Sequence, residues 1–198
     1  MVHPSPDETR HLKAIAREMF ESGEESGYLV GVATAHHPAF SRSRRPSSAL
    51  ERELVLDAVR RAASREGVFV EDLSGGVDLV TSDGGHIRRY RVKRGERSTS
   101  GYRFVCGLGS SLLTAEPDGL FVEDRWLLGY ISSDDHTLDE VVAAEVVGHR
   151  GDGGGPVVLI LGTVIRLSDA PPPDGFTSTD EGLSGFDDDD EAGGADVA

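Results

Sequence analysis

Six basic side chains stand close together in an otherwise acidic sequence, within the stretch HIRRYRVKRGER at residues 86–97. A guanidinium group is planar and donates two parallel hydrogen bonds, so arginine is well suited to bind phosphate oxygens. Tyr90, or Tyr102 further on, offers a ring on which a nucleic-acid base can stack. The pattern predicts nucleic-acid binding through the following residues: Arg88, Arg89, Arg91, Lys93, Arg94 and Arg97.

The same stretch also has a purely structural interpretation. If it forms a β-strand, its side chains alternate between two faces, and only one face can point into the core. Arginines in an acidic protein commonly pair with carboxylates on neighbouring strands, here Glu71, Asp72 or Asp78. The strand geometry would place the basic residues in two sets, Arg88 and Arg94 on one face and Arg89, Arg91 and Lys93 on the other.

Acidic residues around the basic stretch form a second pattern. A helix with Glu51 or Glu53, a strand with Asp78 and a strand ending in RVK (91–93) resemble the layout of restriction-endonuclease-like nucleases. The motif of that family is an Asp followed by an acidic-x-Lys triplet, and the resemblance implies a Mg²⁺-dependent phosphodiesterase relative. Arg91 stands where the motif has its second carboxylate, and a guanidinium repels the metal ion. The alternative to a binding protein is therefore a degenerate nuclease of this type.

Other metal-ligating or nucleophilic side chains form weaker patterns. The run DDH at 134–136 contains ligand types that bind metals, and Glu145 and His149 would share a face if they lay on a helix. Acidic residues before Thr137 are equally typical of a turn, which we favour. Cys106 is the only cysteine and has apolar neighbours, as expected for a small buried side chain. We predict no catalytic residue, metal site or cofactor.

The N-terminal region has helical signals. The run SPDE at 5–8 is typical of a capping box with proline in the first turn. Apolar residues then recur at helical spacing from 12 to 20, and Gly23 is the predicted end. Residues 28–34, YLVGVAT, are predicted to form a strand. A loop follows, and three of its residues would extend a basic patch: Arg42, Arg44 and Arg45.

A second helix and a series of strands are predicted next. The run SALE at 48–51 indicates another capping box, and Gly67 is the predicted stop. Glycine-rich turns at 74–76 and 83–85 are suited to tight β-hairpins. The segment at 137–149 begins like a helix but is rich in valine, and we predict a strand there.

These elements predict an α+β fold, with N-terminal helices packed on a mainly antiparallel β-meander or partly closed barrel. The domain is expected to cover residues 1–169. Prolines at 171–173 prevent a strand or helix from continuing, and residues 180–198 contain eight acidic and no basic residues. Residues 170–198 are therefore predicted to be a Pro/Gly-rich linker and a disordered acidic tail.

The overall charge bears on the compartment and the partners. The net charge is -15, and Lys13 and Lys93 are the only lysines. Acid excess with little lysine resembles the cytoplasmic proteins of salt-in halophilic archaea, although a GC-rich genome also favours arginine. No apolar run approaches the roughly 20 residues of a membrane helix, and the N-terminus lacks a signal-peptide pattern. We expect a soluble cytoplasmic protein with no membrane association.

Together these patterns predict a non-catalytic binding or adaptor protein. Its partner is a protein or a nucleic acid, between which the sequence does not decide. Concentrated salt screens charges and weakens phosphate binding steeply, so the salt of the compartment affects this choice. The oligomeric state stays open.

Overall fold

The computed structural model describes residues 3–40, 42–73, 76–83, 86–99, 101–107, 110, 112–113, 122–151 and 155–167. Its helices are α1 (Pro6–Ala35) and α2 (Arg45–Glu66). Its strands are β1 (Phe69–Leu73), β2 (Gly76–Asp83), β3 (His86–Arg94), β4 (Glu96–Ser98), β5 (Gly101–Arg103), β6 (Val105–Cys106), β7 (Val122–Ser132), β8 (Leu138–Arg150) and β9 (Val157–Arg166). The predicted linker and acidic tail lie outside the described residues. No helix in the described ranges is both long and apolar enough to cross a membrane.

The start of α1 confirms the predicted capping box. The Ser5 side chain accepts a hydrogen bond from the Glu8 amide (3.3 Å), and the Glu8 carboxylate accepts one from the Ser5 amide (3.2 Å). The predicted end at Gly23 and the strand at 28–34 are both wrong, because α1 continues without a break to Ala35.

The glycines of α1 serve close packing. A Cβ at Gly23 would meet the Leu138 side chain at 3.0 Å, and a Cβ at Gly27 would meet the Asp135 carbonyl at 2.8 Å. Both contacts involve the end of the β7–β8 hairpin, more than a hundred residues away in the sequence. Glycine here makes room for a neighbouring segment, which a local pattern does not reveal.

The start of α2 also differs from the prediction. The helix begins at Arg45 with Arg44 as its N-cap, and that cap makes no side-chain hydrogen bond. Ser48 and Glu51 therefore lie inside the helix, where they contact other elements instead of capping it. The predicted end is confirmed, because Gly67 adopts a left-handed conformation with φ 69°.

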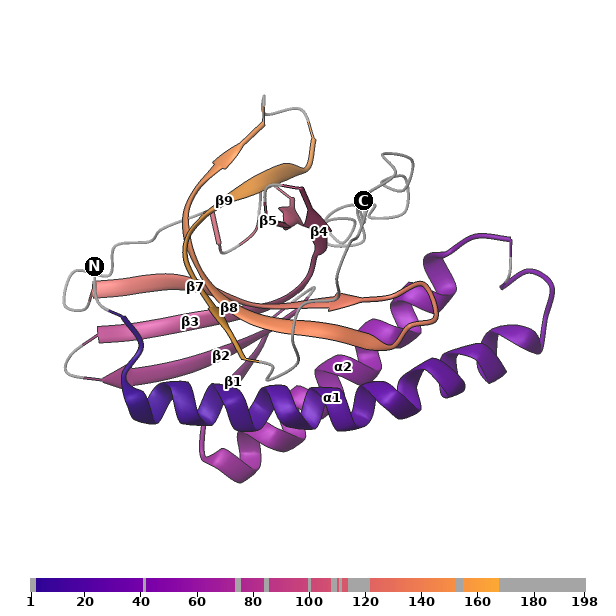
Figure 1. Ribbon diagram of the computed structural model, residues 1–198, viewed down its shortest axis with the longest axis horizontal. Coiled ribbons are helices and arrows are strands. Elements are labelled where there is room, and N and C mark those ends of the chain that lie inside the picture. The colour runs from indigo at the N-terminus through magenta and orange to yellow at the C-terminus, as the bar shows by residue number, and fades with distance from the viewer. Residues whose placement is uncertain are drawn as a thin grey trace, which may run out of the picture.

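The sheet confirms the predicted α+β class. Its strand order is β1-β2-β3-β7-β8-β9-β6, and β4 and β5 form a separate two-stranded ribbon. All neighbouring strands are antiparallel except β3 and β7, which run parallel. The segment at 137–149 is a strand, as predicted, within β8. In Figure 1 both helices lie along one face, and β7, β8 and β9 curl away from them into a half-barrel.

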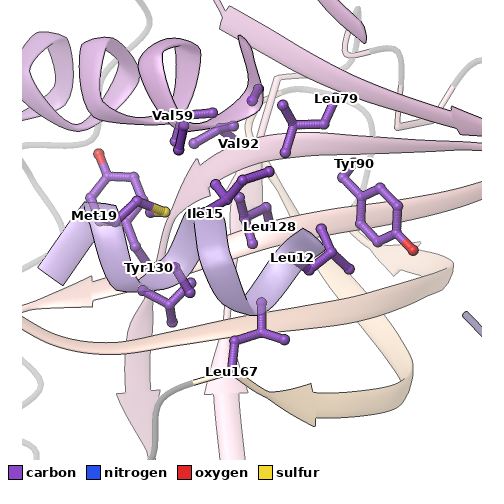
Figure 2. Packing of buried hydrophobic residues seen from close by; sticks show 14 of the residues in the cluster. Leu12, Ile15, Met19, Val59, Leu79, Tyr90, Val92, Leu128, Tyr130 and Leu167 are labelled. Carbon is purple, nitrogen blue, oxygen red and sulfur yellow. The ribbon is translucent and has the colours of Figure 1, made fainter. Parts of the chain in front are cut away.

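The main hydrophobic core lies between the helices and the sheet. Figure 2 shows Ile15 and Met19 of α1 and Val59 of α2 directed towards Leu128 and Tyr130 of the sheet. The opposite, concave face of the sheet carries a second cluster. It includes Phe104, Cys106, Leu127, Val142, Val157 and Leu159.

Two glycines allow the concave cluster to close. A Cβ at Gly95 or Gly129 would overlap the Phe104 ring, which is fully buried. Phe104 therefore packs directly on the backbone of β7, and this contact fills the inside of the curl.

Gly129→Ala is expected to destabilise the protein by about 1–3 kcal/mol, because it overpacks the concave cluster. Gly31→Ala is the matched control. Gly31 is exposed on α1 with open space around it, so alanine should stabilise the helix by up to about 1 kcal/mol. Urea unfolding followed by circular dichroism measures both changes. Equal effects of the two substitutions would contradict the proposed packing of Phe104.

Candidate functional site

The predicted basic residues lie mostly on β3, which is hydrogen-bonded to β2 on one side and β7 on the other. Tyr90 and Val92 belong to the helix-side core. By alternation Arg88 and Arg94 share that face. Arg91 lies on the opposite face, as the strand pattern predicted.

Arg88 is buried against the start of α1. It is 1% exposed and donates to the Glu8 carboxylate at 2.5 Å. Glu8 also accepts from the hydroxyls of Tyr90 (2.9 Å) and Thr81. Burial and the nearby Glu8 charge raise the pKa of Tyr90 well above its usual value, so its hydroxyl stays a donor. Glu8, which completes the capping box of α1, is thus also the counterion of Arg88 on β3.

Arg94 belongs to a second buried cluster, centred on Glu51 of α2. Glu51 is fully buried and accepts from the Ser132 hydroxyl at 2.5 Å. Its other carboxylate oxygen lies 2.6 Å from Nδ1 of His136 and 3.4 Å from the Arg94 guanidinium. His136 has a φ of 66°, a conformation that is unfavourable for residues other than glycine. The β7–β8 turn is therefore anchored to α2.

Arg91 pairs with Asp78 across β2 and β3 at 3.2 Å, and both are buried. Burial raises the pKa of Asp78 although Arg91 opposes the shift. Asp78 lies on the sheet face away from the helices, whereas Glu51 lies in the helix layer and Glu53 is exposed. The structure does not bring the nuclease-like residues together. Within the described ranges, no group of three or more His, Cys, Asp or Glu is placed to hold a metal ion.

The remaining predicted arginines also contact acids. Arg89 donates to Glu71 of β1. Arg97 of β4 donates to Glu140, which is 3% exposed and also accepts from the Tyr102 hydroxyl at 2.6 Å. These contacts tie the ribbon of β4 and β5 to β8.

All five arginines among the predicted nucleic-acid-binding residues thus contact a carboxylate, and Lys93 is half-buried on β3. Arg89 has the most exposed side chain of the five arginines, at 38%. Nucleic-acid binding through this strand stays a prediction. To present Arg88 or Arg91 to a phosphate, the protein would have to break a buried ion pair.

A different surface, which we call the helical tip, comprises residues 28–45: the end of α1, the connecting loop and the first residue of α2. In Figure 1 it projects beyond the β7–β8 turn. Val30 in this range is buried, but four large apolar side chains of the tip are exposed, at 72% for Tyr28, 42% for Leu29, 43% for Val32 and 44% for Phe40. Sequence reasoning missed this surface because it assigned 28–34 to a strand. The helical spacing of Tyr28, Leu29 and Val32 was the available signal.

The helical tip is also basic. Arg42, Arg44 and Arg45 are exposed, and residues 36–45 contain no acidic residue. Arg44 lies 3.2 Å from Asp134, and both side chains are at least 74% exposed. An ion pair this exposed to water is weak and is readily exchanged for another partner. The tip therefore combines apolar side chains with arginines that a ligand can reach.

A cleft of about 400 Å³ lies where β7 begins and β8 ends. Two of the polar side chains that line the cleft form hydrogen bonds to nearby backbone groups. Arg125 donates to the Leu112 carbonyl (3.1 Å), and Glu145 accepts from the Thr163 amide (3.3 Å). His149 also lines the cleft, but on a strand, so the helical pairing with Glu145 is not formed.

No protein-family model matches the chain, and neither the curated proteins nor the solved structures contain a significant match to it. The site must therefore be interpreted from its own geometry.

Glu8→Ala is expected to destabilise the protein by about 3–5 kcal/mol, because it removes the closest carboxylate from a buried arginine. Ser5→Ala, which removes only the cap, should cost about 1 kcal/mol. Urea unfolding of both variants measures the difference. A loss in Glu8→Ala no larger than that in Ser5→Ala would show that the ion pair with Arg88 contributes little.

The turn carboxylate Asp135 should titrate unusually low. It accepts hydrogen bonds from the hydroxyls of Ser133 and Thr137 and from the Thr137 amide, which lower its pKa to about 2. In the unfolded chain the value is about 3.9, so this stabilisation is present above pH 4 and is lost as the pH falls towards 2. Carboxyl-detected NMR should give a midpoint near the lower value. A midpoint near the unfolded value would mean that the turn bonds are absent in solution.

Proposed function

We propose that this protein is a non-catalytic binding or adaptor protein that engages a protein partner through the helical tip. The exposure of the tip carries the proposal. Four of the eight large hydrophobic side chains exposed within the described residues gather there: Tyr28, Leu29, Val32 and Phe40. Several large apolar side chains exposed in one region are typical of interaction sites.

The chemistry of the tip suggests the kind of partner. Tyrosine and arginine are enriched among the residues that dominate binding energy at protein interfaces. Here an apolar patch adjoins Arg42, Arg44 and Arg45, with no acid between residues 36 and 45. A partner segment that carries apolar side chains flanked by carboxylates would complement both features.

The charge balance favours a protein over a nucleic acid. The acid excess and lysine depletion support our proposal of a salt-rich cytoplasm, where phosphate-driven binding is steeply weakened. Apolar burial persists under such conditions. The nucleic-acid form of the proposal uses Arg88, Arg89, Arg91, Lys93, Arg94 and Arg97. It is weaker because the pairing of the five arginines with internal acids competes with phosphate.

The test uses this protein as bait to capture binding partners from native high-salt extract, with and without nuclease treatment. The double variant Tyr28→Ser/Phe40→Ser is expected to lose a protein that the unaltered chain retains, because the apolar anchors are gone. Phe69→Ser is the control, since Phe69 is 65% exposed but lies on β1. Mass spectrometry of the captured proteins provides the measurement.

Two results would overturn this proposal. One is capture that nuclease abolishes and Arg89→Glu reduces, which supports the nucleic-acid form instead. The other is equal capture by the tip variant and the Phe69→Ser control.

A further inference from the structure

We infer that the acidic segment at residues 186–191 of this same chain, FDDDDE, docks on the helical tip and competes there with the partner. The segment lies outside the described residues, and its sequence complements the tip. The inference rests on the proposed function only in naming a competitor; the docking itself is independent of it.

The acidic segment and the helical tip are complementary: both carry apolar side chains, and their charges are opposite. Phe186 is followed by five consecutive acidic residues. The tip offers the exposed Phe40, followed within five residues by three arginines, and further exposed apolar side chains at the end of α1. An aromatic anchor beside a carboxylate run thus faces an apolar patch beside a guanidinium run.

The basic strand is a poorer partner for the same segment. Arg88 and Arg91 are each at most 7% exposed and already contact carboxylates, so acidic residues would have to displace buried counterions. At the tip, Arg44 contacts Asp134 only through an exposed pair that exchanges at little cost.

The length of chain beyond the described residues is sufficient. The amide of Leu167 is bonded to the Val141 carbonyl on β8, and the nearby Leu138 lies against Gly23 of α1. Three strand residues and the rest of α1 place the tip about 30 Å from Leu167. The chain from Leu167 to Phe186 can extend about 60 Å, so the segment reaches the tip.

Acidic residues of α1 determine how the docked acidic segment is oriented on the tip. Glu24 and Glu25 are exposed one turn before Tyr28 and would repel the acidic run. The carboxylates should therefore lie along the loop arginines, with Phe186 against Phe40 and Val32.

The experiment places a spin label on the full chain at Ala192→Cys and records amide line broadening by NMR. Cys106 is 2% exposed, so the label reacts at the new site. Broadening is expected at residues 28–45 at the lowest salt that keeps the native circular dichroism spectrum. It should weaken as salt is added, because exposed charges are screened.

Matched variants separate docking from chance proximity. Phe40→Ser with Arg42→Glu is expected to lose the broadening, and so is Phe186→Ala with Asp187 to Asp190 replaced by Asn. Phe69→Ser with Arg17→Glu should retain it, because Phe69 and Arg17 are exposed away from the tip. Broadening centred on β3, spread evenly, or growing with protein concentration would overturn the inference; growth with concentration would indicate binding to a second copy.

The outcomes distinguish this inference from the proposed function. If the label fails to broaden the tip while Tyr28→Ser/Phe40→Ser still abolishes capture, the docking is wrong and the adaptor proposal stands. If the tip is broadened but capture is unchanged in that variant, the segment docks and the adaptor proposal fails. When both are correct, deletion of residues 180–198 should increase capture at the low salt at which the segment docks, and the increase should shrink as salt is added.

Discussion

The structure depends on pairing between buried carboxylates and arginines. An unpaired charge inside a protein is very costly, whereas a paired and hydrogen-bonded one is tolerated. Glu8, Glu51, Asp78 and Glu140 are each at most 4% exposed, and each contacts an arginine. Three of those arginines lie on β3, and their acids lie on α1, α2 and β2. This strand is the third of seven in the sheet and lies next to β2, a position from which it reaches all three elements.

This pairing changes the meaning of the basic stretch. In the sequence it is the strongest candidate for phosphate binding, because six cations lie within ten residues. In the fold its arginines pair with internal acids. Glu8, for example, both completes the helix cap of α1 and neutralises Arg88. Among the described residues, exposed apolar side chains and exposed arginines instead occur together at the helical tip, which we propose as the binding surface.

Local patterns predicted the elements whose stability is local. The Ser5 cap, the Gly67 stop and the alternation along β3 follow from hydrogen bonding and backbone geometry within a few residues, and all three were predictable. The predictions at Gly23 and Ser48 were wrong because the roles of these residues come from distant segments. Gly23 accommodates Leu138, and Ser48 accepts a hydrogen bond from Arg94 at 3.2 Å.

The sequence by itself determined the α+β class and the uneven distribution of charge, because periodicity, turn chemistry and composition are properties of the chain alone. It only favoured a strand over a helix at 137–149. Only the tertiary structure decided which acids meet which arginines, that α1 continues through 28–34, and that the described part of the chain leaves Tyr28, Leu29, Val32 and Phe40 exposed. Those outcomes depend on contacts between residues far apart in the sequence, such as Glu8 with Arg88, which are eighty positions apart. No local pattern encodes such contacts, because the two partners meet and interact strongly only after folding has brought them together away from water.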